Sequence, residues 1–167
     1  MTIKAKLYFE NDVNANAIVA CLKNLPEPIR PVYFTENEGK IKKVNVLSDD
    51  NRFQDFKNNN PLGFFLYADN ETCFNISKHS VGYADVTLWL EDQTKSELAI
   101  EFLKSLVRFN PIFGFICDDM EYNHRNRYYI TFGRNHIEDW VGRKLEKYIS
   151  GMYWYTLLSH KLLIKHQ

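Results

Sequence analysis

The stretch that most constrains the fold is YADVTLWLE, residues 83–91, in which apolar and polar side chains alternate. A period of two in hydrophobicity predicts a β-strand with one buried face. The apolar set comprises Ala84, Val86, Leu88 and Leu90. Asp85, Thr87 and Trp89 fall on the other, largely polar side. We therefore expect Trp89 to be either covered by a helix or exposed for binding.

Amphipathic helices are predicted next to the two most regular strands. Residues 3–10 alternate like residues 83–91, and helical spacing of apolar residues follows over 13–25. After residues 83–91, Thr94 and Glu97 have the spacing of a capping box. The box would open a helix that carries an apolar stripe and ends before Asn110-Pro111. Each of these strands is thus followed by a helix that has an apolar face to bury.

Shorter elements fill the rest of the chain. Strands are predicted at 32–35, 42–47, 62–68, 72–77, 112–117 and 127–132. A weak helix is predicted at 50–57, and a further helix is expected from its N-cap Asn135 to residue 148. Hairpin-like neighbours mixed with helices predict an α+β fold, a largely antiparallel β-sheet with about three α-helices packed on it. Residues 1–167 are expected to form a single domain.

Charge and hydropathy argue against two classes of partner, nucleic acids and membranes. The 21 Lys and Arg residues balance the 21 Asp and Glu residues. Nucleic-acid binders usually carry a basic excess, because phosphate contacts dominate their affinity. No stretch approaches the roughly 20 apolar residues of a membrane span, and the first residues do not resemble a secretory signal. We expect a soluble, cytoplasmic protein without a nucleic-acid or membrane partner.

The acidic cluster Asp118, Asp119 and Glu121, with His124 behind it, is the main candidate for chemistry. Carboxylates and a histidine suit a divalent metal or acid–base catalysis. Adjacent residues of one loop or strand point to opposite sides, however, and metal ligands have to converge. A solvated loop is therefore the favoured interpretation. An acidic surface that docks on a basic partner is an intermediate one.

Other motifs give no catalytic centre. The chain has neither GxSxG nor a glycine-rich phosphate loop, and Ser159-His160 are adjacent, which does not set a base against its nucleophile. Cys117 follows an apolar run, which favours an inert thiol. Three widely spaced cysteines without CxxC indicate neither disulfides nor zinc. We predict no catalytic residue, no metal and no cofactor.

One segment resembles a known family. VGRKLEKYISGMYWYTLLS, residues 141–159, resembles the C-terminal signature of immunity proteins from bacterial polymorphic toxin systems, nearest to immunity family fifty-two. The family pattern has a tyrosine, a proline-glycine pair and a Tyr-Trp pair, and it ends in Phe or Leu followed by Gly or Ser. The matching residues are Tyr148, Gly151, Tyr153, Trp154, Leu158 and Ser159. Ser150 departs from the pattern, because it stands where proline is usual.

The resemblance implies a non-enzymatic protein that binds a cognate toxin and covers its active site or substrate path. Aromatic and acidic side chains suit the blocking of a basic cleft. The residues expected to face the partner are Asp118, Asp119, Glu121, Tyr122, Glu36, Glu38 and Trp89. Two alternatives stay open: a small hydrolase or transferase that uses Asp119, Glu121 and His124, and a phage-type or adaptor structural protein. No feature of the sequence distinguishes a monomer from a dimer.

The aromatic run after Gly151 is interpreted as packing. A glycine there can adopt the left-handed conformation that ends a helix, after which the chain turns extended. Side chains then alternate, so Met152 and Trp154 are expected on one side and Tyr153 and Tyr155 on the other. One of these two sets is expected to be buried.

Overall fold

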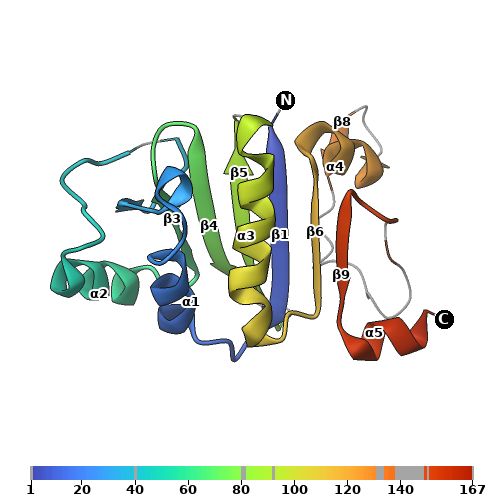
Figure 1. The fold of residues 1–167 in the computed structure, drawn as a ribbon, viewed down its shortest axis with the longest axis horizontal. Helices are drawn as coiled ribbons and strands as arrows, with labels where there is room; N and C mark the ends of the chain where they lie inside the picture. Colours follow the sequence, from blue (N-terminus) through green and yellow to red (C-terminus); the bar gives the residue numbers. More distant parts are fainter. Residues whose placement is uncertain are drawn as a thin grey trace.

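Seven strands form one antiparallel sheet in the computed structural model of the chain (Figure 1). The structure describes residues 2–39, 41–79, 82–91, 93–130, 134–137, 149 and 151–166. The strands of this sheet are β1 Ile3–Glu10, β2 Tyr33–Thr35, β3 Gly63–Tyr67, β4 Thr72–Lys78, β5 Tyr83–Leu90, β6 Phe113–Asp118 and β9 Tyr155–Leu158. Their order across the sheet is β2-β3-β4-β5-β1-β6-β9, and each neighbouring pair is antiparallel.

The described residues also hold five α-helices and a second, two-stranded sheet. The helices are α1 Ala15–Leu22, α2 Asp50–Asn59, α3 Ser96–Leu106, α4 Asp119–Arg125 and α5 His160–Lys165. Short 3-10 turns lie at Glu27–Ile29, Gln93–Lys95 and Val107–Phe109. The small sheet pairs β7 Arg127–Ile130 with β8 Arg134–Ile137. The predicted α+β class and the antiparallel sheet are confirmed, with more helices than the three expected.

The main core lies between the sheet and the helices α1 and α3, which cover one face (Figure 1). The apolar sides of β1 and β5 supply Ile3, Leu7 and Leu88, all at most 1% exposed. Phe102 of α3 is fully buried, and its ring lies 5.9 Å from that of Phe74 on β4. The apolar side chains of residues 3–10 and 83–91 thus face the helices, as the alternation predicted.

Helix α2 docks on the β2–β3 end of the sheet through aromatic contacts. Phe53 is the buried residue of this helix, and its ring centroid lies 5.3 Å from Phe34 and 5.6 Å from Phe64. The remainder of α2 is mostly polar, which is why its sequence pattern is weak.

A second, smaller core lies on the opposite face, over β1 and β6. It joins Tyr8, Phe113, Phe115, Cys117, Tyr122, Tyr153 and Leu162. The ring of Phe115 stacks with Tyr122 of α4 at 5.3 Å and with Tyr153 at 4.6 Å. Helix α4 and the C-terminal segment therefore cover the β6 side of this face, while β4 and β5 carry mostly polar side chains there.

The aromatic run after Gly151 divides differently from the expectation. Only Tyr153 is buried, whereas Met152, Trp154 and Tyr155 are 67%, 49% and 51% exposed. Gly151 has φ 128°, and a Cβ there would clash with the guanidinium of Arg125. Glycine thus permits the close approach of Arg125. The helix end that Gly151 was expected to form lies outside the described residues.

Several local expectations were wrong. Residues 42–47 form no strand, because β2 pairs with β3 and only a single bridge joins Tyr33 to Val46. The capping box does not form, since a 3-10 turn places Thr94 inside helical backbone and Lys95 becomes the N-cap, without a side-chain bond.

Among the described residues, no helix is long and apolar enough to cross a membrane.

Two further corrections concern residues 118–148. The polar segment after β6, favoured as a solvated loop, is helix α4, because the Asp118 carboxylate accepts hydrogen bonds from the amides of Met120 and Glu121. Asn135 was expected to begin a helix, but it lies in β8, where it pairs with Tyr129. The rest of that expected helix, residues 138–148, lies outside the described residues.

Candidate functional site

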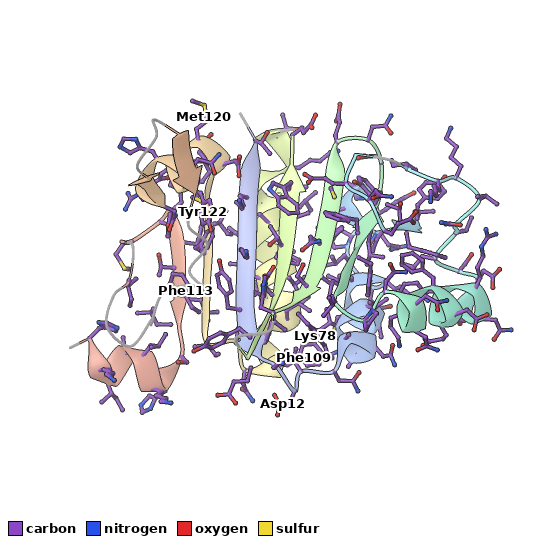
Figure 2. All side chains as sticks on the ribbon, turned by 180° about the vertical axis from the view of Figure 1, so that it is seen from behind. Asp12, Lys78, Phe109, Phe113, Met120 and Tyr122 are labelled. Atoms are coloured by element: carbon purple, nitrogen blue, oxygen red, sulfur yellow. The ribbon has the colours of Figure 1, made fainter. Side chains whose placement is uncertain are left out.

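The sheet face opposite α1 and α3 carries the polar sides of its central strands, and Figure 2 shows the molecule from this side. The strand registers align these side chains in three rows across β4, β5, β1 and β6. The rows are Cys73, Trp89, Lys4 and Cys117; Asn75, Thr87, Lys6 and Phe115; and Ser77, Asp85, Tyr8 and Phe113. We call this surface the open face because α1 and α3 lie on the other side of the sheet; several of its side chains, such as Thr87 and Asp85, are nevertheless buried.

A hollow of about 260 Å³ lies on the open face. We call it the face hollow, and its lining residues are Lys4, Lys6, Glu38, Phe65, Asn75, Ser77, His79, Asp85, Thr87 and Trp89. Strands β1, β3, β4 and β5 supply eight of them, and Glu38 comes from the loop after β2. The backbone amide of Gly39 donates to the Tyr67 hydroxyl at 2.7 Å, which holds this loop against the sheet.

Asp85 organises the middle of the face hollow. Its side chain is 2% exposed, and one carboxylate oxygen lies 2.5 Å from Nε2 of His79 and 3.6 Å from Nζ of Lys6. The other oxygen accepts a hydrogen bond from the Thr87 hydroxyl at 3.2 Å. A buried carboxylate needs such partners, because an unpaired charge away from water is costly. The cluster therefore fixes side chains of β1, of β5 and of the turn after β4 relative to one another.

Lys4 organises the side of the hollow nearest α4. Its Nζ lies 3.1 Å from Asp119 Oδ1, 3.9 Å from the ring centroid of Tyr122 and 5.6 Å from that of Trp89. Cations are attracted to aromatic faces within about 6 Å. One lysine thus ties α4 to β1 and β5.

The structure brings four of the seven expected partner-facing residues to the face hollow. Trp89 and Glu38 line it, while Asp119 and Tyr122 contact Lys4, which also lines it. Trp89 lies on the face opposite α1 and α3 and is half-buried. It is therefore neither fully covered by a helix nor fully exposed, the two positions expected from the sequence. The two acidic segments, 36–38 and 118–121, flank the hollow from different sides.

The other three expected residues are engaged elsewhere. Asp118 caps α4 and is 9% exposed. Glu121 pairs with Arg125 at 2.7 Å on the same helix. Glu36 pairs with Lys42, whose hydrogen bond lowers the pKa of the Glu36 carboxyl. These carboxylates serve a helix end and local ion pairs.

Sequence reasoning missed the charged residues at the centre of the hollow. Lys4, Lys6 and Asp85 occupy polar positions of strands that were correctly predicted, so the alternation itself was a usable signal. His79 carries no comparable signal, because it follows β4 and reaches Asp85 only through the β4–β5 pairing.

The acid–base cluster of the enzyme alternative does not converge. Successive residues of an α-helix are 100° apart, so Asp119 and Glu121 on α4 point in nearly opposite directions. Asp119 pairs with Lys4, and Glu121 pairs with Arg125. Within the described ranges, no three His, Cys, Asp or Glu side chains are arranged to hold a metal ion. This geometry gives the enzyme alternative no support.

The thiols of the open face are held in their protonated form. Burial raises the pKa of Cys73 to about 11 and that of Cys117 to about 12. Because only the thiolate is nucleophilic, we expect iodoacetamide at pH 8 to alkylate Cys73 at least about a hundredfold more slowly in the native protein than in the unfolded chain. Mass spectrometry of tryptic peptides over time measures both rates. Comparable rates would contradict the burial argument.

A larger hollow, of about 560 Å³, lies at another end of the sheet, near Asp12 and Phe109 in Figure 2. Its charged lining side chains, Glu10, Asp12 and Lys161, are all exposed. Buried charges in a hollow are the stronger sign of a built site, because solvent already satisfies exposed ones. The smaller face hollow is therefore the better candidate.

Comparisons with protein-family models, curated proteins and solved structures give no match for this chain.

Proposed function

We propose that this chain is a non-enzymatic immunity protein of the bacterial cytoplasm. It binds a cognate toxin domain and neutralises it by covering the active site or the substrate path. The observation that carries the proposal is the face hollow, where carboxylates and aromatic rings from distant segments flank one surface. The resemblance of residues 141–159 to immunity proteins supports the same function.

The open face has the rigidity that tight binding needs. Asp85 is held by Lys6, His79 and Thr87, and Lys4 is held by Asp119. Side chains ordered before association lose little conformational entropy when a partner arrives, so more of the contact energy appears as affinity. Acidic groups at the rim favour a partner whose cleft is basic.

Co-expression with a toxin tests the proposal. The toxin domain is taken from the gene immediately upstream, and growth of a bacterial host is followed with and without this chain. We expect growth to be rescued, and the two proteins to elute together in size-exclusion chromatography. A non-cognate toxin is the control. Absence of both rescue and a complex would overturn the proposal.

The open face is tested in the same assay. Glu38→Lys combined with Trp89→Ala should abolish rescue, because both side chains line the face hollow. Asp12→Lys is the matched control, since it reverses an exposed charge outside the face hollow. Rescue by the double variant at the level of the control would place the interface elsewhere.

A further inference from the structure

Glu38 differs from the other carboxylates at the face hollow. Asp85 has three partners, and Asp119 is bonded to Lys4 and to the amide of Asn123. Glu38 is exposed at the rim, and no hydrogen bond or ion pair joins its carboxylate to any of the described residues. The hollow therefore carries one negative charge that the described part of the chain leaves unmatched.

Two aromatic rings stand in the same hollow. Phe65 of β3 and Trp89 of β5 both line it, and both residues are half-buried. Aromatic faces attract cations, and a planar guanidinium stacks on them better than an ammonium does. Rings beside an unmatched carboxylate form a site for a flat cation.

The sign of the ligand follows from the groups already present. Lys4 and Lys6 are 11% and 6% exposed in their side chains, and each is paired with a carboxylate. An incoming anion would have to displace these internal partners and would meet the carboxylates of Glu38 and Asp85, which line the hollow. A cation can pair with Glu38, whose carboxylate is bonded to none of the described residues. The size also limits the ligand, because about 260 Å³ is below the roughly 300–1,000 Å³ of small-molecule sites.

We propose that the face hollow receives one arginine side chain of the partner, with its guanidinium paired to Glu38 and flanked by Phe65 and Trp89. This inference deepens the proposed function and rests on it for the identity of the partner as the toxin. The inference specifies one contact: a single arginine that projects from the toxin and enters the face hollow. A general attraction between an acidic and a basic surface would not require such a residue. If this arginine serves the toxin's active-site cleft, its binding in the face hollow removes it from that cleft. The toxin would then be inhibited without any chemistry by this chain.

The test uses small probes in place of the toxin. The ¹⁵N-labelled protein is titrated with N-acetyl-arginine methylamide, and the indole N–H signal of Trp89, assigned with Trp89→Phe, is followed by NMR. We expect a saturable shift at millimolar concentrations. N-acetyl-glutamate methylamide, under the same conditions, should leave the signal in place.

Variants of the loop after β2 locate the charge. Glu38→Gln should weaken arginine-probe binding by about three- to fivefold, as for a partly exposed ion pair. Glu36→Gln is the matched control, because this neighbouring carboxylate already pairs with Lys42. Equal binding by the wild type and Glu38→Gln, or a shift with the glutamate probe alone, would overturn the inference.

The two proposals fail separately. If the protein binds the arginine probe through Glu38 but does not rescue growth, the arginine site stands and the proposed immunity function is overturned. If the protein rescues growth but does not bind the arginine probe, the immunity function stands and the arginine site is overturned.

Discussion

Asp85→Ala is expected to lower the free energy of unfolding by about 3–5 kcal/mol, the usual cost of breaking a buried ion pair. The Asp85 side chain is 2% exposed and that of Lys6 is 6% exposed, so solvent screens their interaction little. Without the carboxylate, the Lys6 ammonium and the His79 ring lose a common acceptor, and the Thr87 hydroxyl loses its bond to Asp85.

Urea denaturation followed by circular dichroism measures the change. Asp12→Ala is the matched control, because this aspartate is exposed, and it should change stability by no more than about 0.5 kcal/mol. A second comparison uses Lys6→Met alone and with Asp85→Ala. If the two charges depend on each other, the double variant is less destabilised than the sum of the single variants. A loss below about 1 kcal/mol for Asp85→Ala, with additive single effects, would contradict the proposed role of the cluster.

The position of Asp85 makes this a prediction about function as well as stability. It holds Lys6 of β1, Thr87 of β5 and His79, which follows β4, around the face hollow. Its loss therefore loosens the surface that is proposed to meet the toxin. The charged and aromatic side chains of the hollow come from segments that are distant in the chain, and Asp85 bonds to several of these side chains.

Local patterns predicted the most regular strands, β1 and β5, well, because alternation is a property of neighbouring residues. The apolar sides of 3–10 and 83–91 face α1 and α3, and their polar sides form the open face. Strand order and the long-range contacts are not encoded in that way. Lys4 and Asp119, which meet beside the hollow, are 115 residues apart, and no local spacing relates them.

Short polar helices were the hardest elements to predict. Helix α4 has one buried anchor, Tyr122, and one cap, Asp118, so its residues read as a charged loop. At Asn135 the opposite error occurred, because a good helix cap lies in a strand that pairs with β7. Tertiary pairing overrides such weak local preferences, since each preference contributes less than a packed contact.

Tyr153→Ala is expected to cost about 3–5 kcal/mol of stability, whereas Trp154→Ala, one residue later, is expected to cost less than about 1 kcal/mol. Tyr153 is 7% exposed, and its ring stacks on Phe115 at 4.6 Å. Its hydroxyl accepts a hydrogen bond from the buried side-chain amide of Asn126 at 3.0 Å. Trp154 is 49% exposed and contributes far less burial.

The adjacent pair separates packing from recognition, because both changes remove a large aromatic ring from the same segment. Tyr153→Phe keeps the ring and removes the hydroxyl with its bond to Asn126, so it should cost about 0.5–1.5 kcal/mol. Thermal and urea unfolding of the three variants give the order directly. If Trp154→Ala were as damaging as Tyr153→Ala, the division of the aromatic run would be wrong. If it unfolded like the wild type but failed to rescue growth against the toxin, Trp154 would belong to the interface, and the Tyr-Trp pair would serve the core with one ring and the partner with the other.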